Sequence, residues 1–86
     1  MSAAASGYRP RDEVRVVRLL VAEREVTGSS ATPPQPRVGD WGIVVADVGD
    51  GIYLVESRTD DGVLLWFAEF SGVELTLIDR PEERHE

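Results

Sequence analysis

Few side chains in this sequence of 86 residues could perform nucleophilic chemistry. Cysteine is absent, and the one histidine, His85, lies next to the C-terminal residue in a charged segment. A catalytic triad needs a base that activates its nucleophile, and that base is most often histidine. Because a histidine in a charged tail is usually solvated, we expect no nucleophilic catalysis, and without cysteine we expect no disulfide or thiolate chemistry.

The carboxylates are numerous, but their positions are typical of turns. The closest candidates for a metal site are two aspartate pairs, Asp47 with Asp50 and Asp60 with Asp61. Each pair falls beside glycine in a predicted hairpin connection, where aspartate is a common turn residue, so we favour turns over calcium binding. The sequence Gly49-Asp50-Gly51 links two predicted strands and opens no helix, so it does not indicate a phosphate-binding loop.

Glu56 and Glu69 fall on strands that are expected to be neighbours, and paired carboxylates can act as general acid and base. So short a chain offers them no deep cleft, and no arginine is expected beside them to stabilise an electrophile. We interpret them as surface acids of a small domain. The sequence therefore predicts a protein that is not an enzyme, with no catalytic residue, no cofactor and no metal.

The net charge of −7 is distributed unevenly. Residues 1–40 hold six arginines and five acids, a balance of +1, whereas residues 41–86 hold three arginines and eleven acids, a balance of −8. Nucleic acids and anionic membranes attract positively charged surfaces, so we expect neither as a partner. A basic protein is the natural complement. Acidity that only maintains solubility is the alternative.

The pattern of apolar and turn residues predicts an all-β domain. Residues Glu13 to Val21 (EVRVVRLLV) are rich in valine, which favours a strand. A helix is the alternative, because Val16, Leu19 and Leu20 would share one helical face. The remaining predicted elements are strands at 41–48, 52–57, 63–70 and 75–78, with a single helical turn at 71–74.

The segment from Ala22 to Arg37 is predicted to be one long loop. It holds three prolines, which can neither continue a helix nor enter a sheet ladder. Pro33 to Pro36 also has the PxxP spacing of polyproline ligands, but a stiff loop explains the prolines equally well.

Five strands, a long proline-rich first loop, two hairpins and a helical turn before the last strand predict a small five-stranded SH3-like barrel. An open sheet with an N-terminal helix is the alternative. We expect a flexible tail at residues 1–10, the barrel at 11–80 and a charged tail at 81–86. No apolar run approaches the roughly 20 residues of a membrane span, and residues 1–10 do not resemble a signal peptide, so a cytoplasmic location is expected.

Several short motifs strengthen the barrel prediction. They are Asp12-x-Val14, Gly39-Asp40-x-Gly42-x-Val44-Val45, Tyr53-x-Val55-Glu56, Asp61-Gly62 and Leu75-x-Leu77. Over about residues 12–79 the sequence resembles a family of short bacterial proteins of unknown function, whose SH3-like barrel is similar to that of nitrile hydratase beta subunits. Trp41 and the length of the proline-rich loop depart from the family pattern. The resemblance implies a docking or accessory subunit and supplies no catalytic residue.

The predicted strand from Val63 to Phe70 is apolar on both faces, although a small barrel buries only one. Part of it must be covered by the long loop, by a tail or by another chain, and exposed aromatic side chains are preferred binding anchors. We therefore predict a non-catalytic interaction module that docks on a basic protein partner or forms a homo-oligomer. The alternative is an immunity protein or antitoxin that neutralises a basic, nucleic-acid-acting partner. The predicted partner-binding residues are Trp41, Glu56, Trp66, Glu69 and Phe70.

Overall fold

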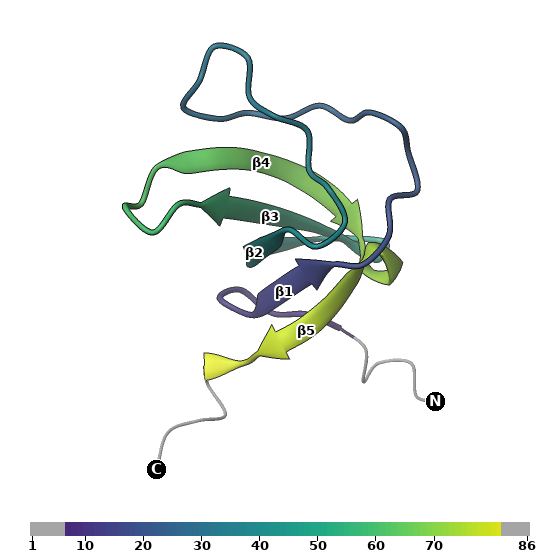
Figure 1. Cartoon of the computed structure of the whole chain (residues 1–86). Coiled ribbons are helices and arrows are strands. Elements are labelled where there is room, and N and C mark those ends of the chain that lie inside the picture. The colour runs from purple at the N-terminus through teal and green to yellow at the C-terminus, as the bar shows by residue number, and fades with distance from the viewer. Residues whose placement is uncertain (1–6, 82–86) are drawn as a thin grey trace.

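The computed structural model describes residues 7–81. Its elements are β1 (Glu13–Val16), β2 (Trp41–Gly49), β3 (Ile52–Arg58), β4 (Leu64–Ser71), the 3-10 helix η2 (Gly72–Glu74) and β5 (Leu75–Asp79). The strands form one antiparallel sheet in the order β4-β3-β2-β1-β5 (Figure 1). The predicted all-β class and the helical turn before the last strand are confirmed. The hydrogen bonds leave β4 and β5 as the edges of this sheet, so they do not close it into a barrel.

The first strand is shorter than the sequence predicts. It ends at Val16, whose N–H donates to the Asp40 carbonyl oxygen, and the helical alternative for this segment is wrong. Beyond it, the N–H groups of Val17 and Arg18 donate to the carbonyl oxygen of Glu74 in η2. These two bonds direct the chain away from the sheet and over η2. The pairing of β1 with its neighbouring strands therefore ends before Val21.

The core lies on one face of the sheet. Successive residues of a strand point to opposite faces, and the buried residues of β3 lie directly opposite the buried residues of β4. Side chains from β1 and β5 join the same cluster, so the sheet bends and packs its two halves together (Figure 1). The buried hydrophobic residues are Val14, Val16, Val44, Tyr53, Val55, Trp66, Ala68, Phe70 and Leu75.

The connection from β1 to β2 runs along the edge of β4 (Figure 1). Thr27 and Phe67 exchange two backbone hydrogen bonds of 3.1 and 2.7 Å, which form an isolated antiparallel bridge. The next residue, Gly28, lies so close to β4 that a Cβ atom there would come within 2.6 Å of the Leu65 carbonyl oxygen. This connection therefore covers part of an edge strand that would otherwise present unpaired backbone groups.

The segment before β1 also packs on the sheet. The Tyr8 ring meets the Tyr53 ring edge-on at 5.2 Å, and its hydroxyl donates to the Leu75 carbonyl oxygen. Buried Asp12 accepts hydrogen bonds of 3.0 and 2.7 Å from Arg80. The packed domain therefore begins at Tyr8, within the predicted N-terminal tail. The rest of that tail (1–6) and most of the predicted C-terminal tail (82–86), with His85, lie outside the described residues. Within residues 7–81, no helix has the length and apolar character needed to cross a membrane.

Candidate functional site

One face of β4 is buried and the other is partly exposed. Trp66, Ala68 and Phe70 point into the core, whereas Leu65, Phe67 and Glu69 alternate onto the outer face of the sheet. Leu65 is 37% exposed, Phe67 is half-buried and Glu69 is exposed. β4 is therefore apolar on both faces because one face fills the core, while the other keeps apolar side chains at the surface.

Two of the five predicted partner-binding residues are core residues rather than surface anchors. Trp66 and Phe70 are each 1% exposed, and their rings lie 5.3 Å apart. The Trp66 Nε1–H donates to Asp40 Oδ2 at 3.0 Å, so the polar atom of the indole is also satisfied. The long loop contributes to this burial, because the Arg24 guanidinium lies 4.3 Å above the Phe70 ring.

The other three predicted residues share the outer face. Trp41, 39% exposed, begins β2, and Ile43 two residues later lies opposite Glu56 of β3. Glu56 in turn lies opposite Phe67 of β4, and Glu69 follows on the same face. Sequence reasoning missed Phe67 as the aromatic of this face. The sequence contains a signal for it: Phe67 and Glu69 are two residues apart on one strand and so share a face, and the charged Glu69 marks that face as the one toward solvent.

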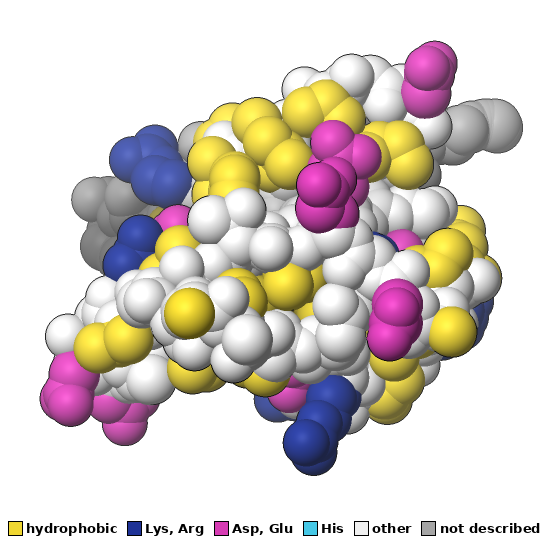
Figure 2. All heavy atoms as spheres, turned by 90° about the horizontal axis from the view of Figure 1, so that it is seen from above, with side chains coloured by type: hydrophobic (Ala, Val, Ile, Leu, Met, Phe, Trp, Pro, Cys, Tyr) yellow, Lys and Arg dark blue, Asp and Glu magenta, His cyan; other side chains and the backbone are white. Residues whose placement is uncertain are grey.

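A groove of about 560 Å³ borders this outer face. The connection between β1 and β2 forms one wall with Leu20, Val21 and Val26, and the sheet forms the other with Leu54 and Phe67. Two acids, Glu25 and Glu69, also line it. Seen from the side of the long loop, hydrophobic side chains gather in patches with acidic side chains between them (Figure 2).

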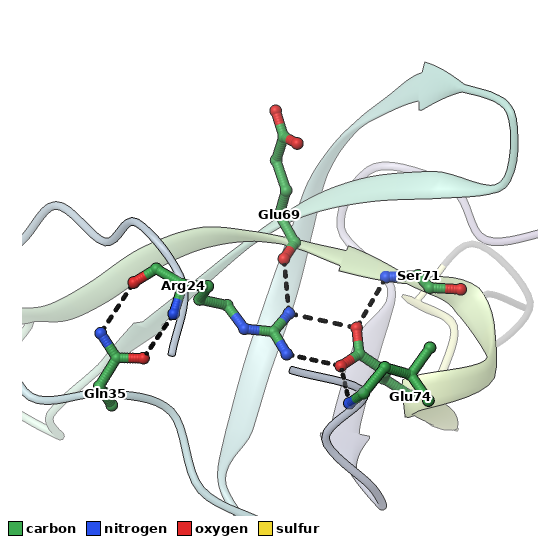
Figure 3. A network of polar contacts seen from close by, with 6 residues as sticks. Arg24, Gln35, Glu69, Ser71 and Glu74 are labelled. Carbon is green, nitrogen blue, oxygen red and sulfur yellow. Dashed lines mark hydrogen bonds and ion pairs between the residues drawn. The ribbon is translucent and has the colours of Figure 1, made fainter. Parts of the chain in front are cut away.

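A buried ion pair between Arg24 and Glu74 also lines the groove, and Figure 3 shows its contacts. Arg24 Nη2 donates to Glu74 Oε2 at 2.5 Å, and Nη1 donates to Glu74 Oε1 at 3.1 Å. Nη1 also donates to the carbonyl oxygen of Glu69 at 2.7 Å, while the Glu69 carboxylate points away from Arg24 (Figure 3). One guanidinium therefore joins the long loop, β4 and η2.

Gln35 holds the backbone of Arg24 in place (Figure 3). Its Oε1 accepts from the Arg24 N–H at 2.9 Å, and its Nε2 donates to the Arg24 carbonyl oxygen at 2.8 Å. The side-chain amide satisfies both backbone groups as a neighbouring strand would. The two limbs of the long loop are thereby tied together.

The pKa of Glu74 reflects two opposing influences. Burial alone would raise this pKa, because it disfavours the charged form. Hydrogen bonds from Arg24 and from the N–H groups of Leu20 and Ser71, at 2.8 and 2.9 Å for the latter two, outweigh burial. The pKa of Glu74 therefore lies below its ordinary value. The pKa of Asp12 is also lowered, because Arg80 and the Arg9 N–H outweigh the effect of burial.

Acid should destabilise the protein through these two carboxylates. A carboxylate whose folded-state pKa is depressed stabilises the fold above its unfolded-state pKa, and this stabilisation is lost as the pH falls through the folded-state value. We expect the free energy of unfolding to be nearly constant above about pH 5 and to fall steadily below it. Urea unfolding at pH 7, 5, 4 and 3 measures this. Glu74→Gln, already less stable at pH 7, should show a shallower decline, and an equally steep decline in that variant would contradict the assignment.

Within residues 7–81, no three histidine, cysteine or acidic side chains converge where they could hold a metal ion. The geometry instead presents an apolar and acidic surface that is fixed to the core by Arg24 and Glu74. No protein-family model, curated protein or solved structure matches the chain.

Proposed function

We propose that this protein is a non-catalytic interaction module that binds a basic protein partner through the outer face of β2, β3 and β4. We also propose that its fold is a small SH3-like barrel. The strand order and the 3-10 turn before the last strand support that architecture. In this architecture, the long first loop flanks the binding face.

The observation that carries the proposal is the composition of the outer face. Trp41 on β2 and Leu65 on β4 are 39% and 37% exposed, and Phe67 is half-buried on β4. Glu56 and Glu69 lie on the same face. Exposed apolar patches flanked by charge are typical of protein-binding sites, and tryptophan is a preferred anchor.

The two acids should contribute unequally. Glu56 already pairs with Arg58 at 3.2 Å across an exposed contact, so part of its charge is compensated. The Glu69 carboxylate is exposed and forms no ion pair within the described part of the chain. Glu69 is therefore a better complement than Glu56 for a cationic side chain of a partner, and the net charge of −7 of the whole chain adds to this attraction.

Replacing Trp41 with alanine should weaken partner binding by about thirtyfold, which corresponds to about 2 kcal/mol for an aromatic anchor. The test is affinity capture from a lysate, identification of the partner and calorimetric titration of the purified pair. Glu69→Lys should slow association, whereas Asp60→Lys, with the same net charge but at a hairpin turn, should have a smaller effect. Unchanged affinity in Trp41→Ala, or a wild-type chain that captures no basic protein, would contradict the proposal.

A second candidate is an inhibitor of a basic, nucleic-acid-acting protein, such as an immunity protein or antitoxin. It is favoured by four exposed aspartates, three in the two hairpin turns and one near the end of β2, where carboxylates could stand in for phosphates. The captured partner distinguishes the two: an inhibitor abolishes the partner's action on nucleic acid, whereas a docking subunit leaves it intact. The four aspartates are Asp47, Asp50, Asp60 and Asp61.

A further inference from the structure

The segment from Val17 to Val21 is an exposed apolar ridge. Val17, Leu19, Leu20 and Val21 are 37%, 38%, 58% and 48% exposed, and Arg18 among them is also exposed. These four apolar side chains fall within five consecutive residues, whereas isolated apolar residues are the ordinary case on a protein surface. The ridge therefore has the composition of a binding element.

The ridge is held in a defined position. The N–H groups of Val17 and Arg18 donate to the Glu74 carbonyl oxygen, and the Leu20 N–H donates to Glu74 Oε2 at 2.8 Å. Leu20 and Val21 also line the groove. The ridge and the groove thus share Leu20 and Val21, and both are fixed to Glu74.

The two surfaces have complementary charge. The groove presents the exposed acids Glu25 and Glu69, and the ridge presents the exposed cation Arg18. Among residues 7–81, none of these three side chains forms an ion pair. The apolar walls of the groove, such as Leu54 and Phe67, match the apolar side chains of the ridge. The ridge has the chemistry that the groove requires of an occupant.

We propose that two copies of this chain form a two-fold symmetric dimer in which the ridge of each copy docks into the groove of the other. Because ridge and groove adjoin, a two-fold axis between the copies makes both contacts at once, as in an isologous interface. Arg18 of one copy then faces Glu69 of its partner, twice per dimer. The inference rests on the proposed function in treating this side of the sheet as a protein-binding surface: Phe67 and Glu69 belong to both, whereas Trp41 and Glu56 lie outside the groove lining.

Sedimentation velocity of the full chain from micromolar to millimolar concentration tests the dimer. We expect a monomer–dimer equilibrium, with dissociation constants raised about tenfold or more by either Arg18→Glu or Glu69→Lys, since each change makes two like-charge contacts. The doubly reversed chain, Arg18→Glu with Glu69→Lys, should recover most of the lost affinity. Matched controls are Arg15→Glu, at an exposed position of β1, and Asp60→Lys at a hairpin turn, which should leave the equilibrium nearly unchanged.

A wild-type chain that stays monomeric throughout this range would overturn the dimer. So would a double reversal without recovery, or controls that weaken the dimer as much as the two test variants. All the substituted residues are exposed, so circular dichroism should show unchanged melting, which keeps misfolding distinguishable from lost association. If the chain is a monomer that binds a basic partner, the proposed function holds and the dimer is refuted. If the chain forms the dimer but captures no basic partner, the dimer holds and the proposed function is refuted.

Discussion

Trp66→Ala should lower the free energy of unfolding by about 3–5 kcal/mol, as for other large core side chains. The indole is 1% exposed, packs against Phe70 and donates its N–H to Asp40. Removing it leaves a cavity and takes away one of the two hydrogen bonds that Asp40 Oδ2 accepts, the other coming from the Arg37 N–H. Since a small domain has only about 5–15 kcal/mol of total stability, this one change should remove a large part of it.

Urea unfolding followed by far-ultraviolet circular dichroism measures the loss. Trp41→Ala is the matched control, because that ring is 39% exposed and its removal should cost about 1 kcal/mol or less. If Trp41→Ala were the more destabilising of the two, the placement of Trp66 in the core would be wrong.

Arg24→Ala should cost about 3–5 kcal/mol, because removing one member of a buried ion pair leaves the other charge uncompensated. Glu74 is 2% exposed and would lose its two hydrogen bonds from the guanidinium. Hydrogen exchange should show the accompanying structural effect: the N–H groups of Thr27 and Phe67, which bridge the loop to β4, should lose protection.

Two control variants separate the cost of an unpaired charge from the value of the pair. Arg24→Met combined with Glu74→Leu replaces both charges by apolar groups and should recover much of the lost stability. Arg58→Ala breaks the exposed pair with Glu56 and should cost less than about 1 kcal/mol. If Arg24→Ala lowered the free energy of unfolding no more than Arg58→Ala, the buried ion pair would contribute no more to stability than the exposed one.

The hairpins could be predicted because their signals are local. Asp50 and Gly51 adopt positive φ angles of 59° and 76°, and Gly62 one of 90°, which short side chains or glycine tolerate best. The sequence placed turns at these residues, and β2, β3 and β4 followed from the apolar segments between them. The end of β1 could not be placed, because the bonds that draw the chain away at Val17 come from Glu74, far along the sequence.

The candidate site was only partly predictable for the same reason. Side-chain type predicts Trp41, Glu56 and Glu69, which do share a face, but placing Trp66 and Phe70 requires knowing which face of β4 points inward. No residue pattern identified the Arg24–Glu74 contact, since fifty positions separate its members. Such contacts depend on how the sheet bends rather than on any local preference.

The reciprocal amide contact between Gln35 and Arg24 changes the entropy of ordering the first loop. A connection from residue 17 to residue 40 that is free along its length costs closure entropy that grows with its length. Gln35 closes a ring of chain between two residues eleven positions apart, and the bridge at Thr27 fixes a point inside that ring. Arg24 joins this ring to Glu74 in the core, so the ring becomes ordered only when the core packs. The loop should therefore melt together with the sheet rather than before it.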